Sequence, residues 1–118
     1  MTTQRRALGL FPSAAIEADA WARRERERDA LRRAFDREGL AQDDIVEASY
    51  RFLARTPSRL LLLQIEDVLG IEDQANLPGT TTEHPNWRRK LPLDLDALET
   101  HPRLGAIAAA IARERPKP

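Results

Sequence analysis

Hydrophobic residues recur at helical spacing in a segment that follows Phe11-Pro12. Ser13 is placed to cap a helix N-terminus and Gly39 supplies a C-terminal stop, so we expect a helix from residue 13 to about residue 38. The charged run RRERERD at residues 23–29 interrupts the apolar positions and pairs opposite charges at helical spacing. We therefore expect a solvated middle section. The apolar positions are Ile16, Ala20, Leu31, Ala34 and Phe35.

A second helix is predicted to begin at Asp43 or Asp44, because Asp44 and Glu47 have the spacing of a capping box. It ends before Pro57, since the residue before a proline avoids the α conformation. Near the C-terminus, Asp94 is placed to cap a short helix, and Pro102 suits the first turn of a last helix. The last helix has one apolar stripe, formed by Leu104, Ile107, Ala108 and Ile111.

The apolar run RLLLLQI, residues 59–65, shows no alternation of polar and apolar positions. Both a buried strand and a buried helical turn fit such a run, and the pattern leaves both open. The chain thus predicts a mainly α fold, with about four helices and one short apolar strand or turn. We expect a single domain, made of a helical part (1–58), the apolar run with a long loop (59–92) and C-terminal helices (93–118).

Composition narrows the classes of function. The chain has 118 residues, and 42% of them are hydrophobic, which is enough for a modest core. Its 19 basic and 19 acidic residues cancel, which argues against binding to nucleic acid or an anionic membrane. The chain lacks cysteine, a membrane-span pattern and a signal-peptide pattern, so we expect a soluble, unprocessed cytoplasmic protein. His84 and His101 lack the carboxylate pattern of a metal site, and no metal or cofactor is expected.

Residues 71–91 are rich in Pro, Gly, Thr and Asn and are predicted to form a loop. Compact domains usually carry a loop of this length only where it has a function or is disordered. Pro78-Gly79 has the φ preferences of a type II turn, so Gly79 is expected to shape the backbone. The primary amide of Asn76 suits sugar hydroxyls, which need both donors and acceptors, and it suits bonds to its own turn equally well. The residue type leaves both interpretations of Asn76 open.

Trp87 precedes the basic triplet Arg88–Lys90 in this loop. Its indole can stack on a pyranose ring or pin the loop to the body of the protein, and the neighbouring Pro85 and Leu91 favour pinning. An aromatic beside a basic triplet also suits single-stranded nucleic acid, but the zero net charge favours salt bridges instead. The expected partners of the triplet are Glu66, Asp67 or Glu83.

The stretch NLPGTTTEHPNWRRKLP, residues 76–92, resembles the C-terminal end of the 4-α-glucanotransferases (amylomaltase or disproportionating enzyme, glycoside hydrolase family seventy-seven). In that family a run of the type N-x-P-G-T...N-W-R-R-K-L-P closes the active-site face. ALGLFP at residues 7–12 is similar to the segment that follows the T-H-D motif of the family. The chain thus resembles the C-terminal part of a much larger enzyme.

The resemblance implies that the catalytic residues lie outside this chain. Retaining glycosyl transfer needs two carboxyl groups roughly 5 Å apart across the glycosidic bond. The adjacent Glu66 and Asp67 would point to opposite faces of an extended segment and do not suit this role. The family carries its catalytic carboxylates in R-x-D-H, E-D-L-G and T-H-D motifs, and none of these occurs here. We therefore expect the chain alone to be inactive.

The resemblance also implies that the chain is the C-terminal fragment of a (β/α)8 TIM-barrel enzyme, with residues 59–65 as the last barrel strand. Side chains near the C-terminal end of that strand would then face the active site. The family's corresponding Asn is implied to touch glucan. The expected substrate-binding residues are Asn76, Gly79, Trp87, Gln64 and Asp67.

In the intact enzyme we expect transfer of α-1,4-glucan segments between maltodextrins, as part of starch and glycogen metabolism, without cofactor or metal. The expected partners are a maltodextrin or α-1,4-glucan and the remainder of the parent enzyme. An alternative is a free-standing helical interaction module that forms oligomers through an exposed apolar strand edge. A nucleic-acid binder that uses residues 87–90 is a third alternative, which the charge balance disfavours.

Overall fold

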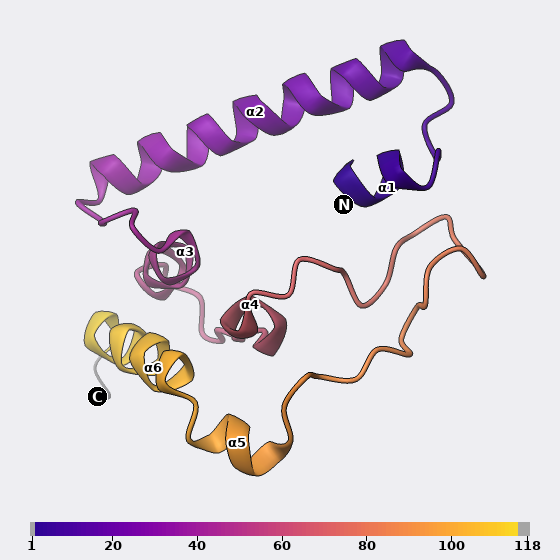
Figure 1. Ribbon diagram of the computed structural model, residues 1–118. Coiled ribbons are helices and arrows are strands. Elements are labelled where there is room, and N and C mark those ends of the chain that lie inside the picture. The colour runs from indigo at the N-terminus through magenta and orange to yellow at the C-terminus, as the bar shows by residue number, and fades with distance from the viewer. Residues whose placement is uncertain (1, 116–118) are drawn as a thin grey trace. The chain divides into compact units, whose positions relative to one another are not determined.

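The computed structural model describes residues 2–115, and this part of the chain is mainly helical, as predicted (Figure 1). It contains six helices and no strand, whereas the sequence predicts about four helices. The two additional helices are short, and neither has an apolar repeat long enough to be recognised from sequence. The helices are α1 (Thr2–Ala7), α2 (Ala14–Arg37), α3 (Ile45–Ala54), α4 (Ile65–Leu69), α5 (Leu95–Glu99) and α6 (Pro102–Glu114).

The predicted capping residues set the helix boundaries. Ser13 Oγ accepts a hydrogen bond from the Ile16 N–H at 3.3 Å and starts α2. Asp44 starts α3, because its Oδ1 accepts the N–H groups of Val46 and Glu47 at 2.9 and 3.2 Å. Asp94 Oδ1 accepts the Ala97 N–H at 2.8 Å and starts α5.

The chain divides into two compact units. The first holds α1, the part of α2 up to Leu31 and the loop Glu72–Lys90. The second unit holds two segments. Arg32–Ile71 contains the last turns of α2 and the whole of α3 and α4, and the described residues from Leu91 onward contain α5 and α6. The charged run of α2 is solvent-exposed as expected, and Arg23 Nε lies 2.9 Å from Glu27 Oε1 within it.

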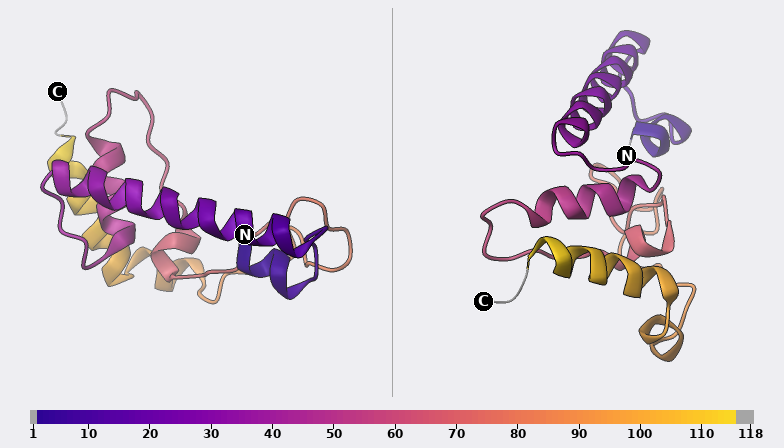
Figure 2. Two further views of the ribbon diagram at one scale, coloured as in Figure 1. Left: turned by 90° about the horizontal axis from the view of Figure 1, so that it is seen from above. Right: turned by 90° about the vertical axis from the view of Figure 1, so that its left-hand side faces the viewer.

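Two clusters form the core of the second unit. In the first, Phe35, Leu40 and Ala48 are buried, and the ring of Phe52 packs edge-on against Phe35 at 5.6 Å. In the second, side chains of α3, α4 and α6 meet, and Figure 2 shows these helices close together. Burying one such side chain contributes about 1.5–3 kcal/mol, which is the main force holding this unit together. The second cluster contains Tyr50, Val68 and Ile107.

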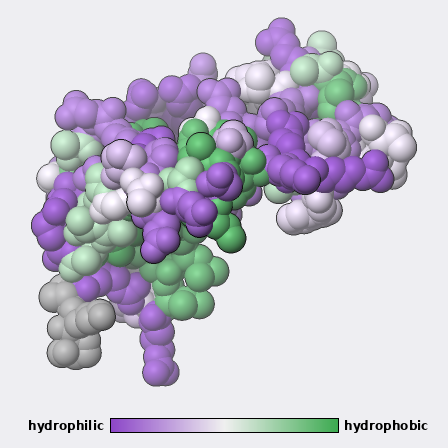
Figure 3. Space-filling model, turned by 60° about the horizontal axis from the view of Figure 1, so that its bottom comes forward, coloured by the Kyte–Doolittle hydropathy of each residue, from purple (hydrophilic) through white to green (hydrophobic). Residues whose placement is uncertain are grey.

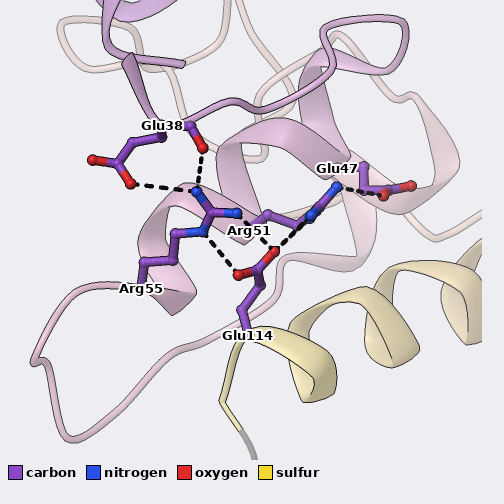
Figure 4. A network of polar contacts seen from close by, with 5 residues as sticks. All are labelled: Glu38, Glu47, Arg51, Arg55 and Glu114. Carbon is purple, nitrogen blue, oxygen red and sulfur yellow. Dashed lines mark hydrogen bonds and ion pairs between the residues drawn. The ribbon is translucent and has the colours of Figure 1, made fainter. Parts of the chain in front are cut away.

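A polar network fastens α6 to α3 at its C-terminal end (Figure 4). Glu114 Oε1 accepts hydrogen bonds from Arg51 Nη2 at 2.6 Å and Nε at 2.9 Å. Glu114 Oε2 accepts one from Arg55 Nε at 2.8 Å, and Arg55 also reaches Glu38. The hydrogen bonds of Arg55, followed by those of Arg51, lower the pKa of Glu114 to about 2.

The apolar run at 59–65 does not form a strand, which corrects one expectation. Residues 60–64 lack regular hydrogen-bonded structure, and Ile65 begins α4. Leu61 and Leu63 pack against the core, while Leu60 and Leu62 are 72% and 73% exposed, the alternation that an extended chain gives. A strand needs a hydrogen-bonded neighbour, and residues 2–115 supply none to this segment.

A helix able to cross a membrane is not found among residues 2–115, since none combines sufficient length with sufficient apolar character.

Candidate functional site

The loop Glu72–Lys90 contains no helix, and the side chain of Asn86 organises it. Asn86 Oδ1 accepts the Leu77 N–H at 2.8 Å, and its Nδ2 donates to the Thr80 carbonyl at 3.2 Å and to Thr80 Oγ1 at 2.9 Å. Leu77 is fully buried beneath these bonds. One amide thus joins three points of the loop, which fixes the shape of the segment between residues 77 and 86.

A tight turn lies inside this segment. The Thr80 N–H donates to the Leu77 carbonyl at 3.2 Å, and Gly79 adopts a φ of 87°. These values agree with the type II turn that Pro78-Gly79 predicts, since its third residue needs a positive φ. Gly79 therefore shapes the backbone next to Asn76.

His84 anchors the base of the loop. It is 6% exposed, and its Nε2 lies 2.7 Å from the Gln74 carbonyl oxygen, so that Nε2 carries the proton and donates it. Among residues 2–115 there is no group of three or more His, Cys, Asp or Glu side chains arranged to hold a metal ion. His84 therefore holds the base of the loop in place through its bond to Gln74.

The side chain of Asn76 differs from that of Asn86. It is partly exposed, and no hydrogen bond joins its amide to any group in residues 2–115. A primary amide at this position can bond to the backbone of its own turn or contact a ligand. Within the described chain Asn86 makes the hydrogen bonds of the turn, and the donors and the acceptor of the Asn76 amide are left without a partner in residues 2–115.

Trp87 is 76% exposed and has a φ of 59°, a value that a bulky residue rarely adopts. Its backbone N–H donates to the Ala75 carbonyl at 2.8 Å. The expectation that the indole pins the loop is therefore wrong for the described chain: the backbone of Trp87 is held, and the ring projects into solvent. Ala75, which accepts this bond, directly precedes Asn76 in the sequence.

The basic triplet pairs differently from the expectation. Arg89 forms an ion pair with Asp73, which also accepts a hydrogen bond from Gln4 Nε2 at 2.9 Å. The bond from Gln4, then that from Arg89, lowers the pKa of the Asp73 carboxyl. The predicted partners Glu66, Asp67 and Glu83 are not used by the triplet within residues 2–115. Glu83 instead accepts the N–H groups of Thr81 and Thr82.

Gln64 and Asp67 belong to the second unit, where Tyr50 links them. The Tyr50 hydroxyl donates to Asp67 Oδ2 at 2.7 Å and accepts the Gln64 N–H at 3.0 Å. Burial, and then the hydrogen bond to Asp67, raises the pKa of Tyr50. Asp67 and Glu66 lie in the first turn of α4, and the Asp67 carboxylate is occupied by Tyr50. Asp67 thus supports this turn.

Sequence reasoning missed two organising residues, Asn86 and Tyr50. An Asn one residue after a proline is a common turn former, and the sequence carries that signal for Asn86. The bond from Tyr50 spans 17 positions to Asp67, and no local pattern announces a contact of that separation.

Comparison with known proteins places these residues in a wider context. A family model described as 4-alpha-glucanotransferase matches residues 17–95. The chain is similar to proteins named 4-alpha-glucanotransferase from Mycobacterium tuberculosis H37Rv and Mycobacterium bovis, with 37% identity over 120 residues in each case. These alignments cover 91% of this chain and 16% of the relatives. A protein of the same name from Haemophilus influenzae is 48% identical over 40 residues, which cover 34% of the chain and 6% of that relative. No solved structure matches.

Proposed function

Because the chain belongs to the 4-alpha-glucanotransferase family, we propose that it contributes the glucan-contacting loop of such an enzyme. The reaction is transfer of α-1,4-glucan segments between maltodextrins by a retaining mechanism. The chain spans 16% of the length of its mycobacterial relatives, and the catalytic carboxylates lie on the rest of the enzyme.

The free amide of Asn76 is the observation that carries this proposal. Glucan hydroxyls need donors and acceptors together, and a primary amide supplies both. Asn76 sits between two fixed points of the loop, because the carbonyl of Ala75 and the N–H of Leu77 are both hydrogen-bonded within it. Because the backbone is held on both sides of Asn76, this residue loses little conformational entropy when it binds a ligand. Gly79 keeps the adjacent turn in shape.

The extended leucines fit the same proposal. Leu60 and Leu62 present apolar side chains to solvent in the second unit. On the face drawn in Figure 3, apolar residues, coloured green, reach the surface. In the intact enzyme this segment serves as the last strand of a (β/α)8 barrel, with one neighbouring strand on each side. Gln64 and Asp67 follow at its C-terminal end, where Asp67 supports the segment through Tyr50.

Binding measurements on the 118-residue chain test the role of Asn76. Titration with maltohexaose, followed by saturation-transfer difference NMR, is expected to detect binding that Asn76→Ala weakens. Gln74→Ala is the matched control, because it removes another primary amide from an exposed position of the same loop and should leave binding unchanged. Gln64→Ala probes the expected site residue in the other unit. Equal binding by the Asn76→Ala variant and the unsubstituted chain would remove Asn76 from the site.

An activity measurement tests the division of roles. Incubation of the 118-residue chain with maltotriose is expected to give neither glucose nor longer maltodextrins. Robust turnover would place the catalytic groups inside this chain. It would contradict the proposal that the catalytic carboxylates lie on the rest of the enzyme.

The exposure of Leu60 and Leu62 also favours a second candidate function, an oligomeric interaction module. The unpaired backbone beside these leucines can pair with the same segment of a second copy. Light scattering is expected to show a dimer or larger species, which Leu60→Ser with Leu62→Ser reduces to a monomer. A monomer at millimolar concentration before any substitution excludes this module.

A further inference from the structure

The backbone of Trp87 is held in a conformation that costs free energy. Trp87 has a φ of 59°, and it is the single residue other than glycine with a positive φ in the described part of the chain. Such strain persists where the surroundings over-determine it, and it gathers at ligand-binding positions. Packing of the indole does not offset this free-energy cost, since Trp87 remains 76% exposed.

Three contacts maintain this backbone. The Trp87 N–H bonds to the Ala75 carbonyl at 2.8 Å, and the side chain of the preceding Asn86 bonds to Leu77 and Thr80. Two residues further on, Arg89 pairs with Asp73. Both sides of Trp87 are thus fixed, so that the ring is presented to solvent from a rigid base.

We propose that Trp87 is a stacking plate for one glucosyl ring of an α-glucan whose neighbouring hydroxyls bond to Asn76. The faces of a pyranose ring carry C–H groups, and an indole offers a matching flat apolar surface. The backbone hydrogen bond from Trp87 to Ala75 joins the chain at Trp87 to the residue that precedes Asn76. This inference rests on the proposed function and adds to it the position and chemistry of a subsite.

The charges of the loop favour a neutral ligand over single-stranded RNA. Glu72, Asp73 and Glu83 balance the triplet Arg88–Lys90, so residues 72–90 carry no net charge when His84 is neutral. Arg89 is already paired with Asp73. A polyanion would meet little electrostatic attraction here, whereas a sugar needs none.

Fluorescence of a single-tryptophan variant tests the stacking plate. The chain has two tryptophans, so Trp21→Phe leaves Trp87 as the sole tryptophan emitter. Titration of this variant with maltohexaose is expected to shift the emission to shorter wavelength in a saturable manner, because stacking removes water from the ring. Cellotetraose, a β-linked glucan, and poly(U) RNA serve as comparison ligands.

Substitutions of Trp87 in the natural background complete the test, with binding measured by saturation-transfer difference NMR. Trp87→Ala is expected to weaken maltohexaose binding about tenfold, and Trp87→Phe to retain most of the affinity. Far-UV circular dichroism and thermal melting of each variant verify that the fold is kept.

The outcomes separate the two proposals. Binding of maltohexaose that depends on Asn76 but leaves the Trp87 emission unchanged, with Trp87→Ala binding as tightly as the unsubstituted chain, overturns the stacking plate and leaves the proposed function standing. Absence of any maltohexaose signal in both experiments overturns both. An emission change with poly(U) and none with maltohexaose assigns the ring to nucleic acid and also overturns the stacking plate.

Discussion

The carboxylate of Asp44 and the guanidinium of Arg103 lie 59 residues apart in sequence and meet in a two-pronged ion pair. Arg103 Nη2 is 2.9 Å from Asp44 Oδ2 and Nε is 3.2 Å from the same oxygen, while Arg103 Nη1 donates to the Val68 carbonyl at 2.9 Å. The pair joins the start of α3, the end of α4 and the start of α6. Burial raises the pKa of Asp44, but hydrogen bonds from the Glu47 N–H and Arg103 outweigh it and lower the net pKa.

Two substitutions separate the capping role of Asp44 from its ion pair. Asp44→Asn keeps an N-cap acceptor and removes the charge, whereas Asp44→Ala removes both, so Asp44→Ala should lower the free energy of unfolding by about 1 kcal/mol more than Asp44→Asn does. Urea unfolding followed by circular dichroism measures the difference. The neighbouring Asp43 provides the control, and Asp43→Ala should change stability little. Equal effects of both substitutions at Asp44 would remove the capping role.

The Glu114 network predicts a stability change in acid. The folded pKa of Glu114 is about 2 and its ordinary value is 4.5, so the carboxylate stabilises the fold above about pH 4.5 and loses that contribution as the pH falls toward 2. Glu114→Gln should therefore lower the melting temperature at pH 7, and the gap to the unsubstituted chain should narrow between pH 4.5 and 2. Melting curves at closely spaced pH values measure this gap. Glu99→Gln, at an exposed position of α5, should show no such pH-dependent gap.

Local rules predict the helix boundaries well because the capping residues act over a few positions. Ser13, Asp44 and Asp94 each bond to an N–H two or three residues ahead, and a sequence displays that spacing directly. The turn at Gly79 follows from the same logic, since Pro78 and Gly79 fix two backbone angles on their own.

The apolar run at residues 59–65 is harder to predict because its structure depends on a partner. Four leucines in a row carry no alternation, yet Leu61 and Leu63 face the core while Leu60 and Leu62 face solvent. The choice between strand and coil rests on whether another strand lies alongside, and this is decided by residues far away or outside the chain.

The sequence points to candidate residues in this loop, but it does not give the orientation of their side chains. Residue chemistry points to Asn76 and Trp87. It does not show that the Asn86 amide takes over the bonds of the turn, nor that Trp87 turns its ring outward. Both follow from hydrogen bonds across nine to twelve positions, from Leu77 to Asn86 and from Ala75 to Trp87, and a loop without periodicity does not reveal them.

The contrast between Asn86 and Asn76 can be measured at single amides. Asn86→Ala removes the acceptor of the Leu77 N–H and the bonds to Thr80, so it should destabilise the loop by about 1–3 kcal/mol. Hydrogen exchange followed by NMR should show faster exchange at the Leu77 amide in this variant. Asn76→Ala is the matched control and should leave that rate unchanged. Similar exchange at Leu77 in the two variants would show that Asn86 does not organise the loop.

Two glycines test whether the turn beside Asn76 needs its positive φ. Gly79 has a φ of 87°, and beyond its chain neighbours no heavy atom lies within 4 Å of the place a Cβ would take. Gly79→Ala therefore meets no steric obstacle and should cost about 1 kcal/mol through backbone strain alone. Gly105 also has free space but lies inside α6, so Gly105→Ala should raise stability by about 0.5–1 kcal/mol.

Two signals follow the unfolding of these two variants. Urea unfolding measured by tryptophan emission reports on the first unit, which holds Trp21 and Trp87, and circular dichroism reports on helix content. Both substitutions add a Cβ atom at a position with no neighbouring heavy atom within 4 Å. If Gly79→Ala destabilises the chain and Gly105→Ala stabilises it, the positive φ of Gly79 is the cause of the difference. A stabilising Gly79→Ala would refute the strain.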